Sequence, residues 1–122
     1  TKEIYKEILK IFDTKGVVCV EFFKKDNKIY VNEIALRVHN TYHISIDCCN
    51  ISQFDIHIRS ILGLNIIKPV FMYSGIMYNI ISNFQNIDDI FKSIDKNKYI
   101  SVKKYFKKEI GIRKIGHVNI IL

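Results

Sequence analysis

Two kinds of hydrophobic spacing divide the first part of the chain. Residues 1–13 carry apolar side chains every three or four positions, which predicts an amphipathic helix with Ile4, Tyr5, Ile8, Leu9 and Phe12 on one face. Residues 16–23 form an almost unbroken apolar run, and residues 28–34 form a second run rich in strand-favouring side chains. Because the polar residues 24–27 separate the two runs, we predict a β-hairpin with its turn there.

A capped helix is predicted after a segment that has no clear period. Residues 35–50 mix polar and ring side chains irregularly, so we predict a loop. Ser52 is a good N-cap residue and Asp55 follows it at the capping-box spacing. Phe54, Ile58 and Ile61 then supply an apolar face, and Gly63 is suited to end the helix.

The last part of the chain is predicted to be mainly extended. Residues 70–82, 99–106 and 114–122 are rich in β-branched and aromatic side chains, and residues 86–94 predict a short helix with acids near its start. Helices and strands therefore occur in both halves, and the fold class is α+β.

Composition and charge narrow the function classes only a little. The formal charge is +7, but sixteen of the nineteen cations are Lys and they are scattered along the chain. Nucleic-acid binding requires clustered cations beside exposed aromatic side chains. The aromatic residues here alternate with apolar ones and are expected in the core, at Phe22, Phe23, Tyr30 and Phe54. A basic nucleic-acid-binding module is therefore kept only as an alternative, and no nucleic acid is expected as a partner.

The lack of a signal-like segment and the pattern of cysteines predict a cytoplasmic protein. The apolar runs are too short to cross a bilayer, so no membrane contact is expected. The start at Thr1 has no Met and no signal-like apolar region, and we expect the chain to begin within a longer protein. Three cysteines, two of them adjacent, do not form a disulfide framework.

Two acids stand in unusual surroundings and predict a metal site. Glu21 lies inside Val-Cys-Val-Glu-Phe-Phe and Glu33 inside Val-Asn-Glu-Ile. A carboxylate in an apolar strand is costly unless it is paired or bound to a metal. If the residue numbers of paired positions on the two strands add up to an even number, both side chains leave the same face of the hairpin. Two carboxylates on one face suit Mg²⁺. The alternative is that one Glu faces solvent on an edge strand.

The segment after Glu33 is rich in groups that handle anions. Arg37, His39, Asn40 and His43 follow the acids within ten residues. A metal with Arg, amide and imidazole donors is suited to phosphoryl and acyl-phosphate chemistry, because it neutralises charge around the transferred oxygens. Zinc held by His39, His43, Cys48 and Cys49 is a weak alternative, since adjacent Cys residues do not easily chelate one ion.

An ordered set of motifs resembles one enzyme family. The set comprises Val-Glu-Phe-Phe, Asn-Glu-Ile-Ala-x-Arg-Val-His-Asn, Ile-Ser-Gln-Phe-Asp-x-His-x-Arg-x-Ile-x-Gly-Leu, Met-Tyr-Asn-Ile-Ile and Arg-Lys-Ile-Gly-His-Val-Asn. In order and spacing it is similar to the C-terminal part of the 5-(carboxyamino)imidazole ribonucleotide synthases, which are ATP-grasp ligases of purine biosynthesis. The resemblance implies the C-terminal half of an ATP-grasp domain over residues 1–66, built from an antiparallel sheet plus helices. It implies an incomplete small β-rich C-terminal domain over residues 67–122.

The resemblance also implies a reaction and a set of roles. ATP would activate bicarbonate as carboxyphosphate, which would carboxylate 5-aminoimidazole ribonucleotide. Glu21 and Glu33 would bind Mg²⁺, and Asn32 with Glu33 would contact the nucleotide. Arg37 would be catalytic, Arg37, His39 and Asn40 would line the bicarbonate and ribonucleotide site, and the ribose phosphate would be held by Lys107, Arg113 and Lys114. The complete enzyme would be a cytoplasmic homodimer, and the isolated chain would be inactive.

Four positions depart from the family pattern. Leu36 replaces a Pro, Tyr42 a Gly, Ile44 a Trp and Ile112 a Gly. These changes keep a further alternative open, in which the chain is a decayed remnant with the same fold and no activity.

Overall fold

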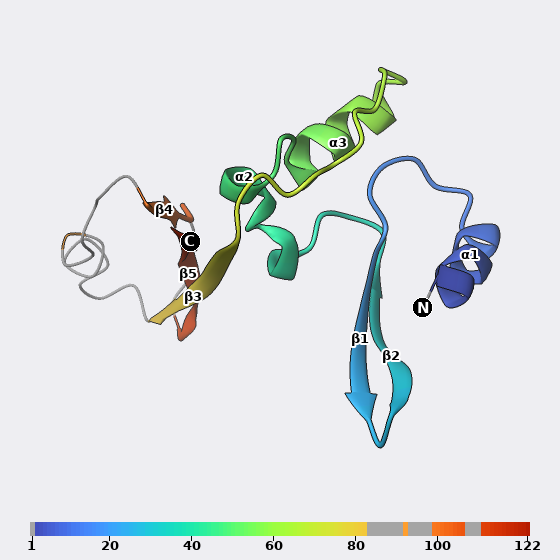
Figure 1. Ribbon diagram of the computed structural model, residues 1–122, viewed down its shortest axis with the longest axis horizontal. Coiled ribbons are helices and arrows are strands. Elements are labelled where there is room, and N and C mark those ends of the chain that lie inside the picture. Colours follow the sequence, from blue (N-terminus) through green and yellow to red (C-terminus); the bar gives the residue numbers. More distant parts are fainter. Residues whose placement is uncertain (1, 83–91, 93–98, 107–110) are drawn as a thin grey trace. The chain divides into compact units, whose positions relative to one another are not determined.

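The computed structural model describes residues 2–82, 92, 99–106 and 111–122 (Figure 1). The chain forms two compact units, the first made of residues 1–42 and 51–69 and the second of residues 43–50 and 70–122. The helix predicted over residues 86–94 lies outside the described residues, apart from Lys92. None of the helices that the structure describes has the length and apolar character needed to cross a lipid bilayer.

The first unit contains the predicted helix and hairpin. Helix α1 spans Lys2–Ile11, and strands β1 (Cys19–Lys25) and β2 (Lys28–Ala35) pair antiparallel. Asp26 and Asn27 both have positive φ angles, 48° and 60°, as a two-residue hairpin turn with the right twist requires. Asp and Asn adopt this conformation more readily than most residues, so the tight turn is encoded locally.

Strand β1 begins three residues later than predicted, because the backbone before it bonds to side chains of helix α3 (Gln53–Ile61). The Gly16 N–H donates to Ser60 Oγ at 3.0 Å, and the Val17 N–H donates to His57 Nδ1 at 3.1 Å. Gly16 has a φ of 108°, which L side chains rarely adopt. The apolar run therefore spans an anchored segment as well as a strand.

The hairpin contains a β-bulge beside the two acids. Phe22 pairs with Val31, whereas the preceding residue, Glu21, pairs with Glu33. Asn32 is therefore the extra residue of β2, with no partner on β1. Paired residue numbers add up to an odd number next to the turn, and the bulge makes their sum even at the acids, so that Glu21 and Glu33 become direct partners.

Helix α3 (Gln53–Ile61) starts and ends as predicted. Ser52 accepts from the Asp55 N–H, and the Asp55 side chain accepts from the Ser52 N–H, so both halves of the capping box are present. Hydrogen bonding to Ser52 lowers the pKa of Asp55 from its ordinary value. Gly63 follows with a φ of 67°.

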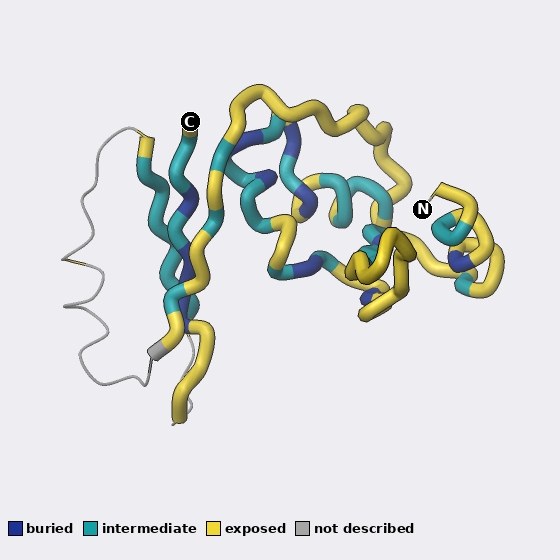
Figure 2. Tube along the Cα trace, turned by 60° about the horizontal axis from the view of Figure 1, so that its bottom comes forward, coloured by how far each residue is buried: buried dark blue, intermediate teal, exposed yellow. Residues whose placement is uncertain are grey.

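The predicted apolar face of α3 is not buried. Phe54, Ile58 and Ile61 are 38%, 55% and 47% exposed, whereas the polar Gln53 is 2% exposed. The expected core aromatics Phe23 and Tyr30 are likewise exposed and stack on each other, with ring centroids 5.1 Å apart. Figure 2 colours the exposed parts of the chain yellow and the buried parts dark blue. The described residues of the first unit thus provide no layer over these faces, and the prediction that they form a core was wrong for this chain.

The predicted loop over residues 35–50 contains two short helices, a correction to the sequence analysis. A 3₁₀ turn spans Asn40–Tyr42 and helix α2 spans Ser45–Cys48. Elements of three and four residues are too short to produce a recognisable hydrophobic period.

The second unit is built on a three-stranded antiparallel sheet. Strands β3 (Gly75–Ser82), β4 (Ile100–Lys104) and β5 (Arg113–Ile121) are arranged in the order β3–β5–β4. The three strands lie within or close to the predicted segments, but β3 begins five residues later than predicted. Opposite β3, the pairing shifts between Ile80 and Ile81, so that Ile115 is an extra residue on β5. Helix α2 packs close to this sheet, since a side chain at Gly75 would meet Cys48 Sγ at 2.6 Å.

The interior of the second unit is unusually polar. Ser45, Cys48, His117 and Asn119 are buried as completely as Ile115. Asn119 donates to Asp47, and the Tyr105 hydroxyl contacts His117 Nδ1 at 2.7 Å. Burial lowers the pKa of His117 below its ordinary value of 6.5; Lys103 lowers it further, and Asp47 acts in the opposite direction.

This depressed pKa predicts a loss of stability in mild acid. The unfolded chain takes up a proton at His117 at a higher pH than the folded chain does. The free energy of unfolding is therefore greatest above pH 6.5, the ordinary pKa of His, and decreases as the pH falls below that value. We expect the melting temperature to fall between about pH 7.5 and pH 5.5, and the fall to be smaller in the His117→Gln variant. Parallel pH profiles for the two proteins would contradict this assignment.

Candidate metal and nucleotide site

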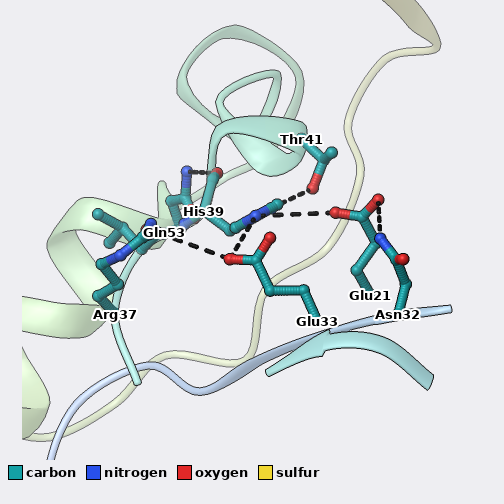
Figure 3. A network of polar contacts seen from close by, with 8 residues as sticks. Glu21, Asn32, Glu33, Arg37, His39, Thr41 and Gln53 are labelled. Atoms are coloured by element: carbon teal, nitrogen blue, oxygen red, sulfur yellow. Dashed lines mark hydrogen bonds and ion pairs between the residues drawn. The ribbon is translucent and has the colours of Figure 1, made fainter. Parts of the chain in front are cut away.

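The two predicted metal carboxylates face each other across the hairpin. Glu21 and Glu33 are direct partners on β1 and β2, so their side chains leave the same side of the ladder (Figure 3). This confirms the predicted shared face. Neither carboxylate is buried, with side-chain exposures of 37% for Glu21 and 46% for Glu33. The apolar sequence around them therefore does not bury the acids, contrary to what their setting indicated.

His39 completes a cluster of three potential ligands. Its Nε2 lies 3.7 Å from Glu21 Oε2 and 3.6 Å from Glu33 Oε1. One donor atom of each residue lies within 4.8 Å of the other two, and no other group of this kind occurs in the described part of the chain. In particular, those residues contain no His–Cys cluster of the kind that the zinc alternative required.

His39 is held by two residues that sequence reasoning missed: Gln53 bonds to its backbone and Thr41 contacts its ring. The His39 N–H donates to Gln53 Oε1 at 2.9 Å, and Gln53 Nε2 donates to the His39 carbonyl at 2.8 Å. On the ring, Nδ1 contacts Thr41 Oγ1 at 2.8 Å, which directs Nε2 toward the carboxylates. Gln53 is the first residue after a helix cap and bonds to backbone fourteen positions earlier, so no local pattern marks it.

Asn32 and Arg37 flank the cluster from β2 and the segment after it. Asn32 Nδ2 donates to Glu21 Oε1 at 3.3 Å, and Arg37 Nη2 lies 3.7 Å from Glu33 Oε1. Arg37 also donates through Nη1 to the Val38 carbonyl at 3.0 Å. With a side-chain exposure of 63%, the guanidinium remains open to a further anion.

The electrostatic field of the acids reaches their neighbour on β1. Burial raises the pKa of the Cys19 thiol, the carboxylates of Glu21 and Glu33 raise it further, and Arg37 opposes them. The two carboxylates thus place concentrated negative charge at this end of the hairpin. Among the described residues, the pair contacts one arginine, Arg37, and the ring of His39, so two carboxylates face a single permanently charged cation, which favours a bound cation.

The donor set fits magnesium. Mg²⁺ is usually bound through one or two carboxylates and keeps its remaining positions for water and phosphate oxygens. Glu21 and Glu33 supply two carboxylates, and their partial exposure leaves room for those further ligands. His39 Nε2 lies beside both carboxylates as a third potential ligand.

The remaining predicted site residues are distributed over both units. Asn40 opens the 3₁₀ turn of the first unit, whereas Arg113 and Lys114 begin β5 in the second. Arg113 and Lys114 are exposed, and Lys107 lies outside the described residues. The expectation that Arg113 and Lys114 hold the ribose phosphate stays a prediction.

A hollow of about 410 Å³ lies elsewhere in the first unit. Its walls are mainly apolar and come from α1, the start of β1 and α3, through residues such as Tyr5, Val18, Val20 and Ile56. It contains none of the three clustered ligands, so it does not compete with them as a site for metal-dependent chemistry.

Comparisons with known proteins show what the chain is similar to in sequence. The ATP-grasp domain family matches residues 1–54. The N5-carboxyaminoimidazole ribonucleotide synthase of Saccharolobus solfataricus is 36% identical over 120 residues, which cover 98% of this chain and 31% of that protein. The chain is a relative of the N5-carboxyaminoimidazole ribonucleotide synthases. It spans about a third of the length of the synthases that it matches.

Solved structures of these synthases extend the agreement to the fold. The synthase of Staphylococcus aureus, complexed with ADP, matches with a TM-score of 0.85 and 31% identity, over 99% of this chain and 33% of that one. The enzyme of Aspergillus clavatus, in complex with ADP and 5-aminoimidazole ribonucleotide, matches with a TM-score of 0.81 and 34% identity, over 99% and 34%. The predicted ATP-grasp fold, with antiparallel sheets plus helices, is thereby confirmed.

Proposed function

We propose that this chain is the C-terminal part of an ATP-dependent ligase that carboxylates 5-aminoimidazole ribonucleotide with bicarbonate. The observation that carries the proposal is the facing pair of Glu21 and Glu33, with His39 close to both carboxylates. The chain that holds this cluster is similar to N5-carboxyaminoimidazole ribonucleotide synthases. In this reaction the γ-phosphoryl group passes from ATP to bicarbonate, giving ADP and carboxyphosphate. The exocyclic amine then takes the carboxyl group and releases phosphate.

Glu21 and Glu33 would hold Mg²⁺, which supplies charge neutralisation to the phosphates when it is bound. The two facing carboxylates, half-exposed and only partly neutralised by protein cations, support this assignment. Asn32 and Glu33 would contact the nucleotide, and the Asn32–Glu21 hydrogen bond keeps the amide beside the metal carboxylates. His39, held by Gln53 and Thr41, restrains both carboxylates from the other side.

Arg37 would stabilise charge on the transferred group, with His39 and Asn40 lining the bicarbonate and ribonucleotide site. Its contact with Glu33 is 3.7 Å, which holds the guanidinium near the metal carboxylate without burying it. Lys107, Arg113 and Lys114 would hold the ribose phosphate, and the exposure of Arg113 and Lys114 at the start of β5 supports this. Residues 67–122 would form the incomplete small β-rich C-terminal domain of a cytoplasmic, homodimeric enzyme.

Arginine replacement tests the phosphate role. In the complete enzyme, meaning these residues joined to the rest of the ATP-grasp fold, we expect Arg113→Ala to raise the KM for 5-aminoimidazole ribonucleotide about 10-fold or more and to leave the KM for ATP unchanged. Arg59 is the matched control, because it lies on α3 and donates to the Asn65 carbonyl. An unchanged ribonucleotide KM in Arg113→Ala would remove this residue from the site.

The same assay tests the reaction itself. ADP release by the complete enzyme should require both bicarbonate and 5-aminoimidazole ribonucleotide, and the isolated chain should give no turnover because it spans only a third of its relatives. Absence of turnover in a folded complete enzyme would favour the decayed-remnant alternative. Turnover by the isolated chain would refute the proposal that the rest of the fold is needed.

A further inference from the structure

The start of β5 changes direction at a β-bulge. On the β3 side, Ile81 pairs with Lys114 and Ile80 pairs with Gly116, so Ile115 has no partner there. Bulges bend the strand that carries them and change where the neighbouring side chains point. This bulge separates the exposed Arg113–Lys114 pair from the buried part of the strand, which begins at Ile115.

Tyr105 holds the bulge from the β4 side. The β4–β5 pairing is regular up to Lys104 opposite Gly116, and the Tyr105 N–H then donates to the Ile115 carbonyl at 2.8 Å. The Tyr105 hydroxyl contacts Nδ1 of His117 at 2.7 Å. Tyr105 thus contacts Ile115, the extra residue of the bulge, through its backbone, and the ring of His117 through its side chain.

The His117 ring is in turn held on several sides. It is 1% exposed, and its centroid lies 5.6 Å from the Tyr105 ring and 5.2 Å from the His43 ring. Asn119, two residues further along β5, is bonded to Asp47 on α2. The strand is therefore anchored by side-chain contacts from the residue that follows β4, from the segment before α2, and from α2 itself.

Stability alone does not account for these polar contacts. His117 Nε2 and Asn119 Oδ1 are buried and have no hydrogen-bond partner among the described residues. Buried polar atoms without partners destabilise a fold, whereas apolar side chains of similar shape would not carry that penalty. Polar contacts do, however, specify one geometry, because they fail when the groups shift.

We propose that Tyr105 and His117 are positioning residues that fix the bulge of β5, and with it the direction in which Arg113 and Lys114 present their charges to the ribose phosphate. The proposal rests on the phosphate role given to those cations above. In this proposal, neither Tyr105 nor His117 contacts the substrate. Their effect passes through the backbone of Ile115.

Kinetics of Tyr105→Phe in the complete enzyme test the proposal. This variant keeps the ring and the backbone hydrogen bond and removes only the hydroxyl. We expect the KM for 5-aminoimidazole ribonucleotide to rise about 5- to 10-fold, while kcat and the KM for ATP stay unchanged. Tyr78→Phe is the matched control: Tyr78 lies on β3 of the same unit and is 57% exposed.

A double-mutant cycle separates positioning from a general loss of structure. If Tyr105 acts through Arg113, Tyr105→Phe should change the ribonucleotide KM much less in an Arg113→Ala background than in the wild type. Equal effects in the two backgrounds, or an unchanged KM in Tyr105→Phe, would overturn the positioning role and leave the phosphate role intact. An unchanged KM in Arg113→Ala would overturn both.

Discussion

Replacing Glu33 by Gln in the complete enzyme is expected to lower kcat by about 100-fold or more while leaving the fold as stable as before, or slightly more stable. Loss of groups that merely support a metal ligand lowers metal affinity or activity about 10- to 100-fold, so loss of the ligand itself should lower it at least as much. Glu21→Gln should behave in the same way, because the two carboxylates form one pair.

The stability half of this expectation comes from the pairing of like charges. Glu21 and Glu33 stand directly opposite each other, an arrangement that destabilises a sheet in the absence of a cation. A purely structural role would require the reverse, a loss of stability when the charge is removed. The readouts are ADP release as a function of Mg²⁺ concentration and the melting temperature without added metal.

Glu7→Gln is the control for the loss of a carboxylate. Glu7 lies on α1, where it pairs with Lys10 at 2.6 Å, and both side chains are exposed. This variant should retain full kcat. Full turnover by Glu33→Gln would refute the metal assignment.

Replacing Gln53 by Leu is expected to destabilise the isolated chain by about 2–6 kcal/mol. Gln53 is 2% exposed and makes two hydrogen bonds to the His39 backbone, so Leu would leave a buried N–H and a buried carbonyl without partners. Each such group costs about 1–3 kcal/mol. Urea unfolding measures the change through the midpoint at constant slope.

The same substitution should also affect the site, because Gln53 holds the backbone of His39 and the His39 ring contacts both carboxylates. In the complete enzyme, more Mg²⁺ should be needed for half-maximal activity. Ile58→Gln is the control on the same helix; Ile58 is 55% exposed, so its replacement should stay within about 0.5 kcal/mol in the isolated chain. An equal loss of stability in both variants would show that any substitution on α3 destabilises the chain, and would contradict a specific contribution of the Gln53 amide.

Features set by neighbouring residues could be predicted from the sequence. The Ser52–Asp55 cap, the turn at Asp26–Asn27 and the antiparallel β1–β2 hairpin follow from local side-chain chemistry and periodicity. The facing acids could be predicted only conditionally, because their register depends on a bulge that no sequence pattern announces. The bulge is a backbone compromise between two strands, and it becomes visible only when both are placed.

Features that depend on distant contacts or on covering layers could not be predicted. The buried amide of Gln53 and the polar interior around His117 depend on partners more than ten residues away. The exposure of Phe54, Ile58 and Ile61 has another cause. An apolar stripe predicts that a face is suited to burial, but whether a layer covers it depends on which parts of the fold are present.

The bulge at Asn32 affects how many polar groups one short hairpin can offer to a ligand. In a regular strand, neighbouring residues point to opposite faces, so a site draws on every second position. Here the extra residue lets Asn32 bond to Glu21 while the next residue, Glu33, still stands opposite Glu21. Three polar side chains thus converge where an unbroken ladder would supply two. Transplanting this site onto another hairpin would therefore require the irregular backbone as well as the three side chains, and deleting residue 32 should retain the acid pair but lose the amide.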